Sequence, residues 1–393
     1  MNAFSYRVEA LQPSAIREIL KFTSDPTVIS FAAGNPAPEA FPTEEIQRIT
    51  TDILTKTPID ALQYSITEGY GPLRQWIRDD LKKKGMYGSD DEVVITSGAQ
   101  QAIEVATKEI CNEGDVIICE APTFIGSLNA FRSYNAKLVG IEMEDDGINV
   151  EKLERALQKY QRVAFIYLIP NFQNPTGVTM SLEKRKKVIE LAQKYNVYIL
   201  EDNPYGDLRF AGDDLPTLKS MDKNGNVIYA GSFSKVLAPG LRVGYMCAPT
   251  NVIAKAIVCM QVSTVHTSIL PQMIAYRFVT ENDFEGHLHG LREIYRKKAD
   301  LMLGKLKMTM PKSIKFTEPE GGLFIWGTLP DGDMNYFCKK AVKNKVAVVP
   351  GNAFLVNESA PCLSFRLNYS TPTDEQIEKG VDILADVARD FYR

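Results

Sequence analysis

The sequence contains little that would indicate a membrane, a metal ion or nucleic acid as its partner. No apolar run approaches the length of about 18 residues that a membrane-spanning helix requires. The chain has only 3 histidines, and His287 and His289 have no third ligand near them, which argues against a metal site. Lysine and arginine number 45 against 49 acidic residues, without a dense basic block, which argues against nucleic acid.

Cysteine is also scarce and widely spaced. The 6 cysteines form no CxxC motif and no metal-binding spacing, so we expect reduced, mostly buried thiols of a cytosolic protein. The segment from Met1 to Tyr6 is polar and lacks the apolar stretch of a signal peptide, which again favours a cytoplasmic location.

The composition that remains is that of an ordinary globular protein, with 45% apolar and 24% charged residues. A length of 393 residues predicts two or three domains. In the middle of the chain, short apolar runs alternate with amphipathic stretches, which is typical of a parallel sheet covered by helices on both faces. The predicted strands are residues 93–96, 116–120, 137–143, 163–170, 197–202 and 227–231, and the clearest helices are 100–111, 150–160 and 182–195.

The C-terminal part has a different pattern. Residues 242–248, beginning at Arg242, form a further predicted strand that follows its predecessor too closely for a helical crossover, so we expect it to be antiparallel. A long helical region over about 251–307 leads to short strands at 323–328, 346–349 and 363–369 and a closing helix from about 373. This pattern predicts a smaller α+β domain.

Polar side chains follow most of the predicted strands, at the edge of the sheet where open α/β proteins bind ligands. The motif Ser97-Gly98-Ala99-Gln100 opens a helix whose first N–H groups suit a phosphate. The other candidates are the flat ring of Phe124, donors at Asn174 and Tyr205, the carboxylate of Asp202, hydroxyls at Ser232 and Ser234, the amine of Lys235 and the guanidinium of Arg242.

One ligand could use all of these groups. It is a phosphorylated aromatic aldehyde that forms an imine with a lysine, pyridoxal 5′-phosphate. Each motif alone has an ordinary interpretation: Ser and Gly cap helices, Asn174-Pro175-Thr176-Gly177 suits a turn, and a single lysine is usually solvated. Their joint occurrence at one edge of the sheet favours the cofactor site.

Three motifs then carry a resemblance to a known family. They are Asn174-Pro175-Thr176-Gly177, Asp202-Asn203-Pro204-Tyr205, and Ser232-Phe233-Ser234-Lys235 followed by Arg242. With them, the chain resembles the fold-type I, class I/II pyridoxal-phosphate aminotransferases over nearly its whole length. Residues 61–64, 69–74 and 364–367 also match signatures of this family, and residues 14–20 and 215–219 look most like its kynurenine/2-aminoadipate aminotransferase branch.

The resemblance implies an α/β fold of the fold-type I PLP-transferase kind. Its large domain holds a mostly parallel seven-stranded sheet with one antiparallel strand, and a smaller α+β domain follows. We expect an N-terminal arm at 1–42 that packs with the small domain, a large cofactor-binding domain at 43–285 and a small domain at 286–393.

The resemblance also implies a role for each matching residue. Lys235 is the lysine that bonds to the cofactor and moves the proton, and Asp202 keeps the pyridine nitrogen protonated. Asn174 and Tyr205 bond the ring hydroxyl, and Phe124 stacks on the ring, where relatives often have tyrosine or tryptophan. The phosphate is held by Ser97, Gly98, Ala99, Gln100, Ser232, Ser234 and Arg242, together with Tyr64 from the second subunit of a homodimer.

For the substrate, the resemblance implies that Arg366 binds the α-carboxylate, with Asn174, Gly34 and the Arg17 region lining the pocket. The expected reaction moves an amino group from an L-amino acid to a 2-oxo acid, with 2-oxoglutarate as the favoured acceptor. The donor stays open between aromatic, 2-aminoadipate-like and branched-chain amino acids. Two alternatives are a carbon–sulfur lyase on the same fold and an aminotransferase-like effector domain of a transcription regulator. About 30 residues precede Ser30–Asn35, which we expect to be too few for a DNA-binding module.

Overall fold

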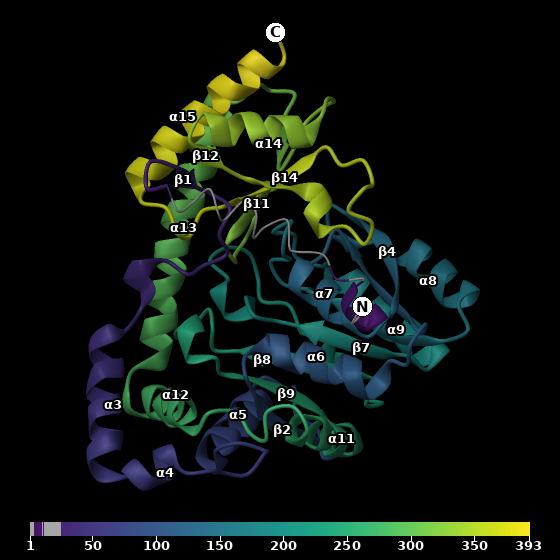
Figure 1. Ribbon diagram of the computed structural model, residues 1–393, viewed down its shortest axis with the longest axis vertical. Helices are drawn as coiled ribbons and strands as arrows, with labels where there is room; N and C mark the ends of the chain where they lie inside the picture. The colour runs from purple at the N-terminus through teal and green to yellow at the C-terminus, as the bar shows by residue number, and fades with distance from the viewer. Residues whose placement is uncertain (1–3, 10, 12–24) are drawn as a thin grey trace.

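A computed structural model describes residues 4–9, 11 and 25–393 (Figure 1). Its main feature is a large sheet with the strand order β2-β9-β8-β7-β6-β3-β4-β5. The strands are β2 (Asp91–Thr96), β3 (Val116–Ala121), β4 (Lys137–Glu144), β5 (Gly147–Ile148), β6 (Val163–Leu168), β7 (Tyr198–Asp202), β8 (Val227–Ser232) and β9 (Gly244–Pro249).

The order and direction of the strands confirm the predicted fold class. Strands β4, β3, β6, β7 and β8 are parallel neighbours, whereas β9 is antiparallel to both β8 and β2. The two-residue β5 extends the expected seven strands at the far edge, antiparallel to β4. Strand β9 begins at Gly244 rather than at the predicted Arg242, because Arg242 has a left-handed φ of 54° and ends the 3-10 helix η3 (Pro239–Leu241).

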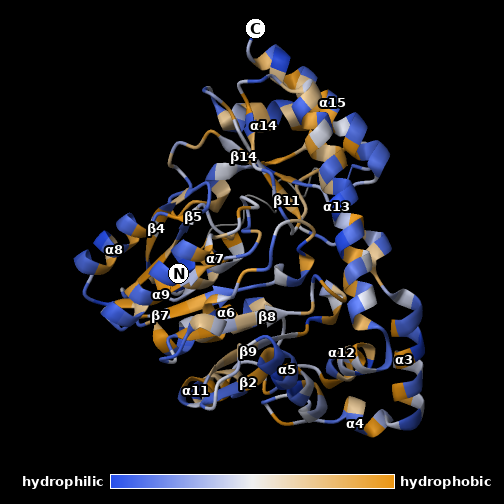
Figure 2. Cartoon of the chain, turned by 180° about the vertical axis from the view of Figure 1, so that it is seen from behind, coloured by the Kyte–Doolittle hydropathy of each residue, from blue (hydrophilic) through white to orange (hydrophobic). Residues whose placement is uncertain are grey.

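Helices cover both faces of this sheet, as the apolar pattern of its strands requires. Side chains alternate along a strand, so on β3 Ile117 and Cys119 join one buried cluster while Val116 and Ile118 join another. The central strands are mainly hydrophobic, whereas outer helices such as α8 mix hydrophilic and hydrophobic residues (Figure 2). The first cluster includes α6 (Ala99–Ile110), α7 (Ile125–Ser133) and α11 (Thr250–Gln261), and the second α8 (Val150–Lys159), α9 (Leu182–Tyr195) and α10 (Leu218–Met221).

A group of helices packs beside the β2 edge of the sheet. Helix α12 (Ile269–Glu281) contacts α3 (Thr43–Lys56), α4 (Pro58–Leu62) and α5 (Gly71–Lys83). The long helical region predicted over 251–307 is therefore divided into α11, α12 and α13 (Phe284–Thr309). The remaining short helices are α1 (Tyr6–Glu9), η1 (Pro38–Ala40), η2 (Gly206–Leu208) and η4 (Gly351–Phe354).

The C-terminal part forms a second, antiparallel sheet with the order β10-β11-β14-β13. Its strands are β10 (Lys315–Phe316), β11 (Phe324–Thr328), β13 (Val349–Pro350) and β14 (Ser364–Asn368). Helices α13, α14 (Met334–Lys343) and α15 (Asp374–Phe391) lie beside it (Figure 1). Near the start of the chain, β1 (Ile29–Ser30) pairs in parallel with β12 (Val346–Ala347), which ties this segment to the C-terminal part.

Two predictions from composition can be compared with this fold. All cysteines are free thiols, and Cys111, Cys119, Cys247 and Cys338 are buried, as expected. Across the described residues, no helix has both the length and the apolar character needed to cross a membrane.

Candidate active site

A cavity of about 420 Å³ lies at the carboxyl ends of the parallel strands, where the sequence predicts the site. Most of the predicted site residues line it, although they come from distant parts of the chain. The predicted residues in its lining are Gly34, Ala99, Gln100, Phe124, Asn174, Asp202, Tyr205, Ser232, Ser234, Lys235, Arg242 and Arg366. The others are Asn35, Ile103, Ile169, Pro204, Pro239 and Phe324.

The N-terminus of α6 forms one end of this cavity. Gly98 has a φ of +74°, which favours glycine, and a Cβ there would lie 2.4 Å from Nη2 of Arg242. That same nitrogen donates to the carbonyl of Ser97 over 3.0 Å, so the guanidinium lies against the turn before the helix. Because Gly98 has no side chain to cap α6, the first N–H groups of the helix are available to an anion.

The hydroxyls predicted to bind the same anion lie at the end of β8 and just after it. Ser232 lines the cavity, and its Oγ accepts a hydrogen bond of 3.1 Å from the backbone N–H of Ser234. This bond closes a tight turn that carries Ser234 and Lys235 into the lining together. Two hydroxyls, one guanidinium and a helix N-terminus thus meet at one place, which is a suitable donor set for a phosphate.

Lys235 presents its amine to the cavity. The amine donates to the carbonyl oxygen of Gly34 over 2.8 Å. Burial lowers the pKa of Lys235 to about 8, with further lowering by the charges of Arg366 and Arg242. A lysine with this pKa is partly neutral near physiological pH, and the neutral amine is the form that attacks a carbonyl.

Asp202 ends β7 and is only 3% exposed. Its Oδ2 accepts a hydrogen bond of 2.7 Å from the hydroxyl of Tyr167, whereas its buried Oδ1 has no partner among the described residues. Burial raises the pKa of Asp202 to about 7, and the bond from Tyr167 acts in the opposite direction. A protonated ring nitrogen would supply the missing donor and favour the charged carboxylate.

Asn174, Tyr205 and Arg366 form a connected group on the other side of the cavity. The Asn174 amide donates to the Tyr205 hydroxyl over 3.4 Å, and Nη1 of Arg366 donates to Oδ1 of Asn174 over 2.8 Å. The guanidinium lies between the rings of Phe324 and Phe354, at 4.4 and 4.9 Å from their centroids. Its Nε is buried and has no partner among the described residues, so it can still bind a carboxylate.

Phe124 and Gln100 lie beside Gly126 in the first turn of α7. The Gln100 amide donates to the carbonyl of Gly126 over 3.1 Å. A Cβ at Gly126 would lie 2.6 Å from the Phe124 ring, so the glycine leaves the space that this ring occupies. Phe124 is half-buried and lines the cavity, and a flat ring in that position can cover one face of an aromatic ligand.

Some predicted site residues do not line this cavity. Ser97 and Gly98 contribute through the backbone turn against Arg242. Tyr64 is 81% exposed and packs edge-on against His266, with 5.9 Å between ring centroids. Arg17 lies outside the described residues.

Polar residues behind the cavity were not predicted from the sequence. The Gln173 amide donates to Oε2 of Glu120 and to the carbonyl of Pro122 over 3.2 and 2.7 Å, and it accepts from Thr176. It thereby joins the turn before Phe124 to the turn that holds Asn174. Glu120 and Tyr167 lie within apolar strands. A polar residue at a buried position of such a strand is the sequence feature that could have indicated a role for each of them.

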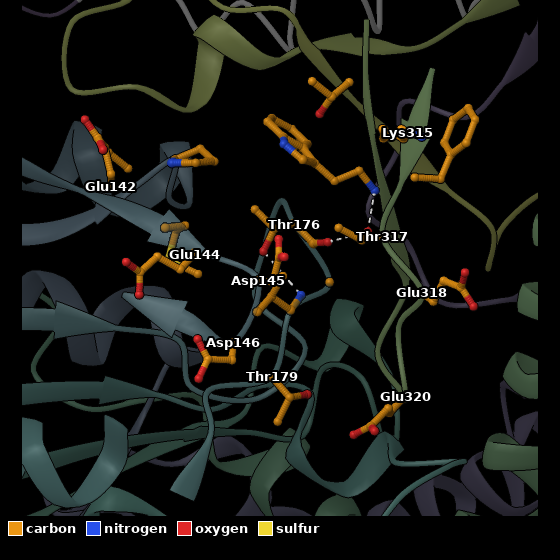
Figure 3. Close-up of a pocket in the computed structure, with 18 residues that line it drawn as sticks. Glu142, Glu144, Asp145, Asp146, Thr176, Thr179, Lys315, Thr317, Glu318 and Glu320 are labelled. Carbon is orange, nitrogen blue, oxygen red and sulfur yellow. Dashed lines mark hydrogen bonds between the residues drawn. The ribbon is translucent and has the colours of Figure 1, made fainter. Parts of the chain in front are cut away.

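The turn that holds Asn174 also contacts a separate cleft of about 720 Å³ (Figure 3). Figure 3 shows Glu142, Glu144 and Asp146 on one side of it and Lys315 and Thr317 on the other, with Asp145 beside Thr176 between them. The Thr317 hydroxyl donates to the carbonyl of Thr176 over 2.8 Å, which fixes the turn from outside. This cleft shares no lining residue with the Lys235 cavity among the described residues.

The residues present fit pyridoxal 5′-phosphate. The cavity offers an anion-binding helix end, an amine of lowered pKa and an unpartnered carboxylate oxygen, which match the phosphate, the aldehyde and the ring nitrogen. When bound, this cofactor supplies an electron-withdrawing ring for chemistry at an amino acid's α-carbon.

Comparison with known proteins gives the same answer. The family model for aminotransferase class I and II matches residues 26–384. The chain is 40% identical to aromatic-amino-acid aminotransferase 1 of Thermococcus litoralis, over 98% of this chain and 94% of that protein. The structure of Pyrococcus horikoshii kynurenine aminotransferase in complex with PMP superposes with a TM-score of 0.95 at 38% identity, covering 99% of this chain and 98% of that one.

A third relative is LysN, the alpha-aminoadipate aminotransferase of Thermus thermophilus, whose structure holds N-(5′-phosphopyridoxyl)-L-leucine. It superposes with a TM-score of 0.91 at 35% identity, covering 99% of this chain and 98% of that one. The chain belongs to the class I and II aminotransferase family and is a transaminase that depends on pyridoxal 5′-phosphate.

Proposed function

We propose that this transaminase takes the amino group of an aromatic, 2-aminoadipate-like or branched-chain L-amino acid and passes it to 2-oxoglutarate. The observation that carries the proposal is the Arg366 guanidinium, which is buried in the same cavity as the Lys235 amine. Asn174 and the carbonyl of Ala32, at 2.8 and 2.7 Å, hold its two terminal nitrogens. A fixed guanidinium can orient an α-carboxylate, and with it the bonds of the α-carbon.

The other side chains have complementary tasks in this proposal. Lys235 would hold the cofactor through its amine and, once the substrate amine has taken its place, would move the proton at the α-carbon. Asp202 would keep the ring nitrogen protonated, and Asn174 and Tyr205 would bind the ring hydroxyl. Phe124 covers the ring, while Ala99, Gln100, Ser232, Ser234 and Arg242, with the turn at Ser97 and Gly98, hold the phosphate.

The aromatic and branched-chain members of the donor class are supported by the apolar part of the cavity lining. Phe324, Ile103, Ile169 and Pro239 contribute to it, and Gly34 adds no side chain of its own. Apolar walls favour aromatic and aliphatic substrate side chains. The names of the relatives point to aromatic, kynurenine and 2-aminoadipate donors, and the leucine adduct of LysN adds a branched-chain one.

The test has two parts. The purified protein should be yellow, and borohydride should fix the cofactor to a single peptide that contains Lys235; a labelled peptide without Lys235 would falsify the mechanism. A panel of amino donors should then form glutamate only when 2-oxoglutarate is present. Release of pyruvate and ammonia without any acceptor would instead indicate the carbon–sulfur lyase.

We also propose that the chain works as a homodimer with Tyr64 completing the partner's site. Tyr64 is absent from the lining of its own cavity, and exposed apolar side chains surround this segment of the chain. Ile59, Leu62 and Ile66 are 72%, 71% and 56% exposed, and an exposed apolar surface of this kind is typical of a subunit interface. We retain the division into 1–42, 43–285 and 286–393, in which β1 links the arm to the small domain.

A further inference from the structure

A chain of three buried polar groups lies behind the cavity. The hydroxyl of Ser127 on α7 donates to the hydroxyl of Tyr167 on β6 over 2.8 Å, and Tyr167 donates to Oδ2 of Asp202 on β7 over 2.7 Å. Ser127 and Tyr167 are 0% exposed and Asp202 is 3% exposed. Only Asp202 of the three lines the cavity.

The direction of these bonds follows from the protons available. A tyrosine hydroxyl has one proton to donate, and its oxygen can also accept a bond. Because Ser127 donates to that oxygen, the single proton of Tyr167 is directed to Asp202. The ring is held in place by Phe131, which packs edge-on with 5.3 Å between centroids. One carboxylate oxygen is thus occupied from behind, and Oδ1 stays without a partner among the described residues.

The electrostatic surroundings of Asp202 make the hydrogen bond from the Tyr167 hydroxyl important. The titratable groups whose pKa the Asp202 charge raises are Tyr167 on β6, Glu120 on β3 and Tyr205 after β7, and none of them carries a positive charge. Among the described residues, only burial and the hydrogen bond from Tyr167 shift the pKa of Asp202, and no lysine or arginine contributes. A buried carboxylate without a cation is stabilised mainly by hydrogen bonds to its charged form.

We propose that Tyr167, oriented by Ser127, is a positioning residue that keeps the Asp202 carboxylate charged and its Oδ1 free for the ring nitrogen of the cofactor. This inference rests on the role proposed for Asp202. It assigns a function in the reaction to two fully buried residues, neither of which lines the ligand cavity.

The test compares Tyr167→Phe with the wild-type enzyme. Equilibrium dialysis against pyridoxal 5′-phosphate measures the cofactor's dissociation constant. Nitrogen-15 NMR of enzyme loaded with ring-labelled cofactor measures protonation of the ring nitrogen. We expect binding to weaken about 10- to 100-fold, as for a lost hydrogen bond to a charged group. We also expect the ring nitrogen signal to move toward its unprotonated position near neutral pH.

Ser127→Ala leaves the Tyr167 ring in place and is the second variant. It should change both measurements in the same direction by a smaller amount, about two- to fivefold in binding, because the tyrosine proton is no longer directed. The control is Tyr369→Phe, which removes a buried hydroxyl that donates to the carbonyl of Gly321 over 3.0 Å in the small domain. It should bind the cofactor as the wild-type enzyme does.

The proposal is overturned if Tyr167→Phe binds the cofactor with unchanged affinity and ring protonation, or if Tyr369→Phe loses as much affinity. Should Tyr167→Phe fail to fold, wild-type behaviour of Ser127→Ala overturns it. Failure of the proposed function is distinguished by a different experiment. If borohydride does not label Lys235 in the wild-type enzyme, the role of that lysine is wrong, whereas the role of Tyr167 is not tested by that result.

Discussion

Nη1 of Arg366 donates to Oδ1 of Asn174 over 2.8 Å, and this bond joins the second, antiparallel sheet to the large sheet at the candidate active site. Arg366 lies on β14, whereas Asn174 lies on the turn after β6. Thr317 reinforces the same connection by donating to the carbonyl of Thr176 over 2.8 Å. The position of the guanidinium that we propose to bind the substrate is therefore coupled to the residue proposed to bind the ring hydroxyl.

Arg366→Lys should keep the positive charge and lose the planar fork. A lysine cannot bind Asn174, Ala32 and a carboxylate with the same geometry, so kcat/KM should fall about 10²-fold or more, for donor and acceptor alike. Steady-state kinetics with both substrates measures this.

The matched control is Arg209→Lys. Arg209 also lies over a phenylalanine ring, at 4.8 Å from the Phe172 centroid, and pairs with Glu320, but it does not line the cavity. It should change kcat/KM by less than about threefold, because Arg209 lies outside the cavity and its partner Glu320 is half exposed. Equal losses in the two variants would refute the role given to Arg366.

Asp202→Asn should preserve the shape of the site and remove the charge opposite the ring nitrogen. We expect kcat to fall by about 10³-fold or more, comparable with the removal of other preorganised electrostatic groups. Rapid measurement of the half-reaction with an amino acid alone tests this without the second substrate. Turnover near the wild-type value would exclude the assignment.

The strand pattern and the motifs at the strand ends were sufficient to predict the sheet, its antiparallel strand and most of the cavity lining. The residue types in each motif suit only a few backbone conformations and a few kinds of chemistry, so each motif narrows the choice of structure and ligand. Ser127, Tyr167 and Gln173 could not be predicted in the same way, because their roles depend on contacts between different strands and helices. The eighth strand β5 was missed since two residues carry no periodic pattern.

The conformation of Arg242 shows a similar limit. The apolar residues after it suggest that the strand starts there, but the guanidinium has to reach the turn at Gly98 and Ser97. A left-handed φ of 54° at Arg242 accomplishes this, and only tertiary structure reveals the need for it.

Glu120→Gln should alter the pH dependence of stability. Glu120 is 1% exposed, and burial raises its pKa to about 8 from an ordinary value of 4.5. The folded chain binds a proton more tightly than the unfolded chain does, so this residue lowers the free energy of unfolding as pH rises from 4.5 toward 8. A glutamine, neutral at every pH, keeps an acceptor for Gln173 and removes this effect.

Urea unfolding of both proteins, freed of the cofactor, measures the difference. The variant should equal the wild type below about pH 4.5 and exceed it by about 4 kcal/mol at pH 8, the linkage expected when a pKa rises from 4.5 to about 8. Parallel stability curves across this range would show that Glu120 titrates normally.

Tyr64→Phe should weaken cofactor retention although Tyr64 lies outside its own cavity. The side chain is 81% exposed, and its place before the exposed Ile66 and after the exposed Leu62 suits a subunit interface. If its hydroxyl binds the partner's cofactor phosphate, the loss should be about 1–3 kcal/mol, as for a bond to a charged group. Equilibrium dialysis against pyridoxal 5′-phosphate gives the value, and Tyr336→Phe, another exposed tyrosine, serves as control.

A shared site can be demonstrated by mixing two inactive variants, Tyr64→Arg and Lys235→Ala, after reversible dissociation. In each heterodimer one site carries both lesions and the other carries neither, because Tyr64 of one subunit serves the Lys235 site of the other. Random pairing makes half of the dimers mixed, so about a quarter of wild-type activity should return. After dilution, the restored activity should be lost over time at the rate at which the dimers dissociate. No recovery after verified mixing, or full activity of a dilute monomer, would contradict a site completed by the partner.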